Sequence, residues 1–176
     1  MLGKNETLIE SKDIIIGNRA AQVTIMAFID YESRKSAEVN EMLKKITTDF
    51  AGKVKLNFRH FPLMSIHQKA LKAAEAVVAA AQEGKFLEMH EILFANQKHL
   101  GVISLKSYAK EIGIINKSFL NNLVNGKYGV HVQDDLKYGI RLGVKELPAI
   151  FINGKKLEGE ITVESLTESI HIALKQ

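Results

Sequence analysis

The sequence predicts an α/β protein, in which a mixed central β-sheet is interrupted by an all-helical insertion. Patterns typical of strands occur only towards the two ends of the chain, whereas residues 67–142 show only helical periodicity. The 176 residues suffice for one domain with a sizeable core. We therefore expect an N-terminal extension (1–12) and a single domain (13–176), with the helical insertion at about 64–143.

Before the insertion, the expected order is strand, strand, helix, strand. Residues 13–16 are a short β-branched segment, and residues 23–29 are apolar at nearly every position, as in a central strand covered on both faces. Residues 37–50 place apolar side chains at helical spacing, and residues 54–58 alternate with the period of a strand.

The sequence of the insertion predicts five helices, which are separated mostly by glycines. They are expected at residues 68–82, 85–98, 104–112, 117–125 and 130–142. Ser104 and Asn116 are the expected N-caps of the third and fourth of these helices.

After the insertion, the strand pattern returns. A strand at 149–152, an Asn-Gly turn at 153–154 and a short strand at 156–160 predict a hairpin. The last helix is expected at 163–174, capped by Thr162, with Ser165 in its first turn.

The segment Ser33-Arg34-Lys35-Ser36 lies between the apolar strand and the first helix, in a chain without cysteine. Two small hydroxyl residues three apart at a helix start have the layout of a Cys-X-X-Cys site, with oxygen in place of sulfur. Thiol–disulfide exchange requires a thiolate as nucleophile. A serine hydroxyl is not appreciably ionised near neutral pH, so the sequence predicts no cysteine redox chemistry.

Several motifs resemble the bacterial DsbA-like thioredoxin family, in particular the branch also found appended to sodium/proton antiporters. Residues 28–32 followed by Ser33-X-X-Ser36 resemble that branch's Phe-X-Asp-Tyr-X-Cys-Pro-X-Cys, and residues 143–154 resemble its Gly-Val-X-Gly-Thr-Pro-Thr-Phe-Phe-Ile-Asn-Gly. Residues 58–63 resemble its third strand, and 73–76, 84–86 and 89–90 its inserted helices. The resemblance spans residues 13–174 and implies a thioredoxin fold with a DsbA-like helical insertion.

The resemblance also implies where a substrate or partner would bind. Leu147-Pro148 should be a cis peptide that faces the helix start at Ser33, and the residue before this proline offers backbone groups to an extended chain. The expected partner is therefore an extended peptide or a protein. The implied groove consists of Tyr31, Glu32, Arg34, Lys35, Leu147 and Pro148, and Ser33 and Ser36 occupy the positions of the redox pair.

The departures from the family pattern are concentrated at this site. Besides the two serines, Arg34 replaces the usual proline and Leu147 replaces the threonine before the cis-proline. We interpret the site as naturally degenerate and the protein as a redox-inactive homologue of thiol-disulfide oxidoreductases and isomerases. The alternative is an engineered Cys-to-Ser form of an active disulfide oxidoreductase, which the coding sequence of the source gene would distinguish.

Ser33 has two interpretations. As an N-cap it satisfies a backbone N–H, and no cofactor is then expected. As a thiolate ligand it would resemble the serine of kappa-class glutathione transferases and related isomerases, with the helix start, Arg34 and Lys35 stabilising the sulfur anion of glutathione. The Ser-Pro-Tyr-Ser-like motif of those enzymes is missing, so the glutathione-dependent enzyme is the alternative and the N-cap is preferred.

The remaining candidate residues are expected to be structural. No His-X-X-X-His pair occurs, so no metal site is expected, and His90 is expected to be packed and hydrogen-bonded. Asp30 is interpreted as a turn former. Six phenylalanines are assigned to the core, namely Phe28, Phe58, Phe61, Phe86, Phe94 and Phe151. Leu147, beside the proline, is expected to enlarge an exposed apolar groove.

Charge and hydropathy exclude two classes of partner. The net charge is +4, but the basic residues are scattered and form no stripe of the kind that binds nucleic acid. The apolar runs are too short to span a membrane. The first thirteen residues contain no apolar segment, so the chain as given is expected to be cytoplasmic or a trimmed extracytoplasmic domain. No oligomeric state follows from the sequence.

Overall fold

The mixed sheet has five strands in the order β1-β3-β2-β4-β5 in the computed structural model, which describes residues 9–176. The central strand β2 pairs in parallel with β3 and antiparallel with β4, as a mixed sheet requires. The strands are β1 (Ile16–Gly17), β2 (Val23–Ile29), β3 (Val54–His60), β4 (Ala149–Ile152) and β5 (Lys155–Lys156).

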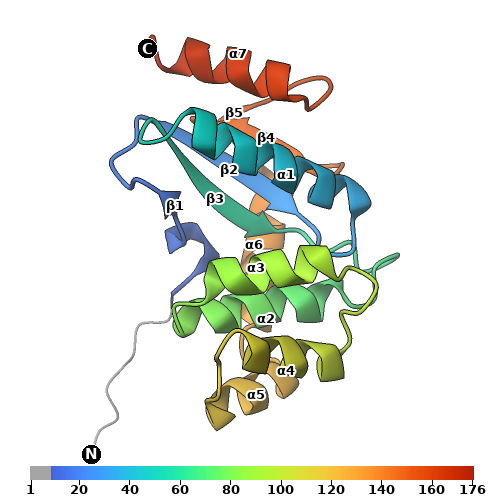
Figure 1. The fold of residues 1–176 in the computed structure, drawn as a ribbon. Helices are drawn as coiled ribbons and strands as arrows, with labels where there is room; N and C mark the ends of the chain where they lie inside the picture. The colour runs from blue at the N-terminus through green and yellow to red at the C-terminus, as the bar shows by residue number, and fades with distance from the viewer. Residues whose placement is uncertain (1–8) are drawn as a thin grey trace, which may run out of the picture.

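Five helices lie between β3 and β4, which confirms the helical segment expected there. In Figure 1, α7 lies above the sheet, α1 runs across it, and α2 to α5 lie below. The helices are η1 (Ser11–Asp13, a 3-10 turn), α1 (Arg34–Asp49), α2 (Ala70–Gln82), α3 (Phe86–Ala95), α4 (Val102–Glu111), α5 (Lys117–Val124), α6 (Gly129–Arg141) and α7 (Val163–Ala173).

Two apolar clusters form the core, one for each face of β2. Ile25 and its alternate neighbours in β2 join the larger cluster together with Leu43 of α1 and Ile170 of α7. Phe28 belongs to a smaller cluster with Phe61, against which the side chains of α6 pack. All six phenylalanines assigned to the core are buried, as predicted.

Helix α6 approaches this smaller cluster closely because position 139 is glycine. A Cβ atom at Gly139 would lie 2.7 Å from the ring of Phe61 and 2.9 Å from that of Phe28. The absence of a side chain at Gly139 therefore allows the helix to pack directly on the two rings.

The structure corrects the prediction at the start of the chain. The first strand is present, but it is β1 at residues 16–17 and not 13–16, because residues 11–13 form a 3-10 turn. The reason is that the side chain of Asn57 donates hydrogen bonds to the carbonyls of Ser11 and Ile14, at 2.8 and 2.9 Å. Residues 1–8 of the expected extension lie outside the described residues.

Other element ends differ by a few residues. Helix α4 begins at Val102 after Gly101, so Ser104 lies within the helix and is not its N-cap. Strand β5 covers only residues 155–156, whereas a strand was expected at 156–160. The chain leaves the sheet after the Leu157 N–H donates to the Ile150 carbonyl. The predicted caps are confirmed at Asn116 and at Thr162, where Ser165 completes a capping box.

Candidate functional site

Ser33 and Ser36 lie at the start of α1, where both hydroxyls accept backbone hydrogen bonds. The Ser36 N–H donates to the Ser33 hydroxyl at 3.2 Å, which confirms Ser33 as the N-cap. The hydroxyl of Ser36 is buried and accepts a hydrogen bond from the Asp30 N–H, also at 3.2 Å. The two side chains thus serve the geometry of the turn that leads from β2 into α1.

The Leu147-Pro148 peptide bond is cis, as the resemblance implies. Ala149 of β4 pairs with Phe28, near the end of β2 from which the chain continues to Ser33. The cis peptide therefore lies at the same end of the sheet as the start of α1. Leu147 is half-buried and packs against the smaller core cluster.

Asp30 holds two loops together below the site. One carboxylate oxygen accepts a hydrogen bond from the Glu32 N–H at 2.7 Å, and the other accepts from the Leu63 N–H and the ring of His67, each at 2.8 Å. The side chain of Asp30 is fully buried. It is a turn former, as expected, and it also fixes the loop that follows β3.

Gln97, in the loop after α3, also holds the segment between β2 and α1 in place by hydrogen bonds. Its side-chain amide donates to the carbonyls of Tyr31 and Ser33, at 2.8 and 2.9 Å. The helical insertion is thus hydrogen-bonded directly to the segment that precedes α1.

The side chain of Tyr31 lies in the core, although the sequence placed it in the groove. Only 1% of Tyr31 is exposed, and its hydroxyl contacts Nδ1 of His90 at 2.8 Å. The other ring nitrogen of His90 lies 2.8 Å from the side-chain oxygen of Asn40. Because that oxygen can only accept, Nε2 of His90 carries the proton and Nδ1 accepts from Tyr31. His90 is packed and hydrogen-bonded, as predicted.

Burial controls the ionisation of this pair. Removal from water lowers the pKa of His90 to about 3, so the ring is neutral near neutral pH. The same burial raises the pKa of Tyr31 well above its usual value. Neither side chain supplies a charge to the site.

The charged residues around the start of α1 are hydrogen-bonded, ion-paired or exposed to solvent. Arg34 is 90% exposed and pairs with Glu38 at 2.9 Å, on the same side of α1. A carboxylate oxygen of Glu32 accepts from the Lys69 N–H at 2.7 Å, which ties Glu32 to the segment before α2. Lys35 is exposed. Of the expected groove residues, Arg34 and Lys35 are thus open to solvent and Tyr31 is not.

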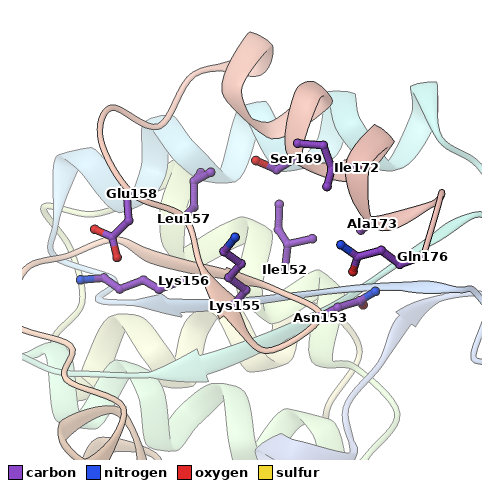
Figure 2. A pocket seen from close by; sticks show the side chains of 10 residues that line it. All are labelled: Ile152, Asn153, Lys155, Lys156, Leu157, Glu158, Ser169, Ile172, Ala173 and Gln176. Carbon is purple, nitrogen blue, oxygen red and sulfur yellow. The ribbon is translucent and has the colours of Figure 1, made fainter.

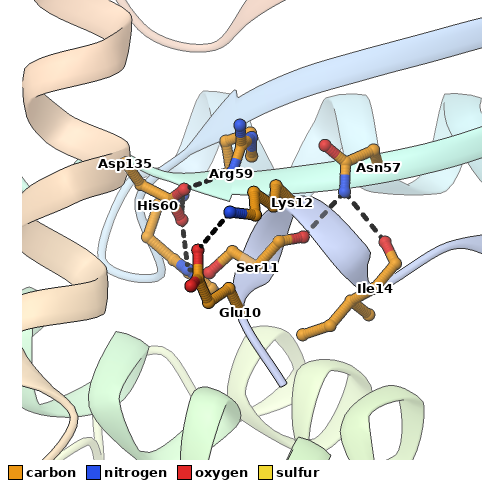
Figure 3. Close-up of polar contacts among 8 residues, drawn as sticks. All are labelled: Glu10, Ser11, Lys12, Ile14, Asn57, Arg59, His60 and Asp135. Carbon is orange, nitrogen blue, oxygen red and sulfur yellow. Dashed lines mark hydrogen bonds and ion pairs between the residues drawn. The ribbon is translucent and has the colours of Figure 1, made fainter. Parts of the chain in front are cut away.

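Ser11, His60 and Asp135 form a buried cluster that has the composition of a catalytic triad but not its geometry (Figure 3). Both the hydroxyl of Ser11 and a carboxylate oxygen of Asp135 lie 3.1 Å from the same ring nitrogen, Nδ1 of His60. A nucleophilic triad requires serine and aspartate on opposite nitrogens of the imidazole. Because Ser11 is also only 1% exposed, the cluster anchors the first described residues to β3 and α6.

Asp135 is the charged centre of this anchor. Burial alone would raise its pKa, but hydrogen bonds and positive charge from His60 and Arg59 outweigh that effect, and the pKa of Asp135 is lowered. An Arg59 nitrogen lies 2.7 Å from its carboxylate, so the ion pair joins β3 to α6. Asp135 is therefore a stabilising anion and not a proton donor.

Sequence reasoning missed three residues that shape this region, namely His67, Gln97 and Asp135. Each has its partner far along the chain: His67 is 37 residues from Asp30, and Gln97 is 66 residues from Tyr31. No local motif marks them. The only available signal was that His67 follows the Phe-Pro-Leu segment at the end of β3.

The described residues form neither a metal site nor a membrane-spanning helix. No group of three or more histidine, aspartate or glutamate side chains within residues 9–176 is placed to hold a metal ion. None of the described helices has both the length and the apolar character needed to cross a bilayer.

The fold and the matching motifs agree with known proteins. Residues 10–171 match the family model described as thioredoxin. The structure is similar to oxidised BdbD from Bacillus subtilis, with a TM-score of 0.84, 24% identity and 92% of each chain covered. It is also similar to a thioredoxin-like oxidoreductase from Silicibacter pomeroyi, with a TM-score of 0.78, 20% identity, and 93% of this chain and 92% of that chain covered.

Relatives by sequence include much longer proteins. The chain is 29% identical to part of the Na(+)/H(+) antiporter NhaA 1 of Salinispora arenicola, over 97% of this chain and 27% of the antiporter. It is 30% identical to part of NhaA 1 of a Mycobacterium species (strain KMS), over 90% of this chain and 26% of that protein. It thus spans about a quarter of these relatives. The chain belongs to the thioredoxin family, with the DsbA-like architecture of that family and without any cysteine.

Proposed function

We propose that this protein is a DsbA-like module without redox activity that binds an extended apolar segment of a partner protein. The observation that carries the proposal is an exposed apolar surface near the cis-proline of a site that has no thiol. Exchange chemistry needs a thiolate, which a chain without cysteine lacks. Recognition needs only the surface and the backbone groups beside it.

We name the apolar surface formed by Leu63, Met64, Ile66 and Leu147 the cis-proline strip. Met64 is 44% exposed and Ile66 is 68% exposed. Leu63 and Leu147 are half-buried, and both pack against the smaller core cluster. Exposed apolar side chains gathered around such a cluster are typical of a binding surface.

The strip is held in place by the polar groups beneath it. Asp30 binds the Leu63 N–H and the His67 ring, and the Ile66 N–H donates to the Leu63 carbonyl at 2.9 Å. A surface fixed in this way loses little conformational entropy when a partner binds.

Backbone groups beside the strip support binding of an extended chain. Neither the N–H nor the carbonyl of Leu147 forms a hydrogen bond to any residue in the described range 9–176. Both are available to a partner that adds as a strand. The carbonyls of Tyr31 and Ser33, by contrast, are occupied by Gln97.

The proposal is tested by titrating the isotope-labelled protein with a short blocked peptide of valine, leucine and threonine. We expect saturable shifts of the amide signals of Ile66 and Leu147. Leu147→Asp should weaken binding roughly tenfold, because it places a charge in an apolar contact. Ile103→Asp is the matched control, since Ile103 is 86% exposed on α4, outside the strip. Equal losses in both variants would contradict the proposal.

Reduced glutathione provides the second arm, which addresses the alternative enzyme. The Ser33 hydroxyl already accepts the Ser36 N–H, so we expect millimolar glutathione to leave the signals of Ser33 and Arg34 unchanged. Saturable shifts there, together with turnover of an electrophilic substrate that Ser33→Ala abolishes, would establish a glutathione-dependent transferase instead.

A further inference from the structure

A separate pocket of about 340 Å³ lies between the β4–β5 hairpin and the last turns of α7 (Figure 2). Ile152 in its wall pairs with Ile25, towards the start of β2, whereas Ser33 follows the end of that strand. The pocket and the cis-proline strip therefore lie at different ends of the sheet.

The strand register explains how a lysine enters this pocket. Lys155 pairs with Ile152 in the antiparallel hairpin, and directly paired residues point to the same face of a sheet. Ile152 belongs to the core cluster that includes α7, so Lys155 also faces α7. Lys156 pairs with Phe151 and therefore points to the opposite face. Figure 2 shows the Lys155 ammonium group rising between Ile152 and Leu157, and Lys156 running outward towards Glu158.

Two hydrogen-bond donors converge in the pocket. Figure 2 shows the hydroxyl of Ser169 on α7 projecting into the space that Lys155 enters. Within residues 9–176, neither the Lys155 ammonium group nor the Ser169 hydroxyl has a side-chain hydrogen bond, and Lys155 has no ion pair. A cation and a hydroxyl in this arrangement can bind a carboxylate, which accepts charge-assisted hydrogen bonds from both.

Besides Lys155 and Ser169, the pocket has an apolar wall, and Asn153, Lys156, Glu158 and Gln176 also line it. Ile152 and Ala173 are buried in its wall, Leu157 is half-buried, and Ile172 is 54% exposed at its edge. An apolar chain lying against Ile172 would remove this area from water. The volume is at the lower end of the range for small-molecule sites, which favours one short acyl chain over a folded partner.

We propose that this pocket binds an apolar monocarboxylic acid, with its carboxylate on Lys155 and Ser169 and its hydrocarbon chain along Ile152, Leu157 and Ile172. The charge complementarity between one carboxylate and Lys155, the lysine whose side chain faces α7, selects this ligand class over a neutral apolar compound. The binding site goes beyond the proposed function and uses none of the residues of the cis-proline strip.

Decanoate is the probe, titrated into the full chain below its aggregation range and followed by amide signals. We expect saturable shifts confined to residues 152–157 and 169–173. Lys155→Gln should weaken binding roughly tenfold, because it removes the charge-assisted contact. Lys110→Gln is the matched control: it removes the same charge from an exposed lysine on α4, which does not line the pocket, and it should leave the affinity unchanged.

Two further measurements keep the result decisive. Decan-1-ol, which has the same chain without the charge, should bind roughly tenfold more weakly than decanoate. The circular dichroism melting curves of both lysine variants show whether they remain folded. The proposal would be overturned by equal affinity for decanol and decanoate, by equal losses in the two lysine variants, or by the absence of saturation. It would also be overturned if the shifts appeared at Ile66 and Leu147, or if an apolar peptide bound more tightly through its free carboxyl end.

Discussion

At the scale of single residues, the polar side chains near the site are committed to holding loops. Asp30 accepts three hydrogen bonds, and His90 is fixed between Tyr31 and Asn40. A buried polar group that has all its partners stabilises the fold, whereas the loss of one partner leaves the other unpaired. These residues are therefore part of the scaffold on which the strip and the helix start are placed.

His90 predicts how stability depends on pH. Its pKa is about 3 in the folded protein and has the usual value near 6.5 in the unfolded chain, so the unfolded state takes up a proton first as the pH falls. The stability that comes from keeping His90 neutral is fully present above the pKa of the unfolded chain. It is lost as the pH falls towards the pKa of the folded protein. We expect the free energy of unfolding to drop by about 2 kcal/mol between about pH 7 and about pH 5 in urea titrations.

Two variants isolate this contribution. His90→Gln should flatten the pH dependence in that range, while also lowering stability at every pH. His99→Gln, which alters an exposed histidine, should leave the dependence as it is. An unchanged slope in the His90 variant would show that other groups control the effect.

Of the residues at the site, the sequence predicted those that belong to a local motif. The Ser33-X-X-Ser36 spacing and the dipeptide Leu147-Pro148 are visible within a few positions. The partners of Gln97 and Asp135 are visible only in the folded chain, because hydrogen bonds over 66 and 75 residues leave no local pattern. The family resemblance placed Tyr31 in the groove, whereas its side chain is buried in the core.

At the scale of secondary-structure elements, periodicity located the helices better than their ends. The apolar spacing predicted all five helices of the insertion. Helices α3 to α6 each bury one face, whereas residues 73–81 of α2 are buried all round. Boundaries depend on single capping contacts, so Gly101 displaced the cap expected at Ser104, and Asn57 held the first segment as a turn. The packing distance between α6 and the sheet had no local signal at all.

Gly139→Ala tests that packing. The new Cβ would lie within 3 Å of two rings, which must shift. We expect a loss of about 1 to 3 kcal/mol in the free energy of unfolding, even though alanine favours a helix more than glycine does. Gly101→Ala is the steric control, because its Cβ would meet nothing within 4 Å and only the N-cap preference for glycine over alanine is lost. A Gly139→Ala variant as stable as the parent in urea would show that α6 can move outward without penalty.

At the scale of the whole molecule, the architecture and the chemistry of the family are separable. The sheet, the cis peptide and the helix start are all present in a chain that has no sulfur nucleophile. A fold can keep its binding surface when the reacting groups are replaced, since function resides in sites and not in the architecture. We expect no reduction of insulin and no oxidation of a reduced model protein above the buffer control.

Restoring the two cysteines tests whether the scaffold still suits exchange chemistry. Ser33→Cys with Ser36→Cys should form an intramolecular disulfide, measurable by thiol titration before and after oxidation. The thiol at position 33 should have a lowered pKa, because it lies at the start of α1 beside Arg34 and Lys35. A folded double variant that never closes the disulfide would show that the local geometry no longer fits.

The two hydrogen bonds of Gln97 also bear on motion. They join the loop after α3 to the segment before α1, and Asp30 joins that segment to the loop after β3. An opening hinge between the insertion and the sheet would have to break these bonds together. We therefore expect the proposed partner to meet the cis-proline strip as a preformed surface, without an induced closure of the insertion onto the sheet.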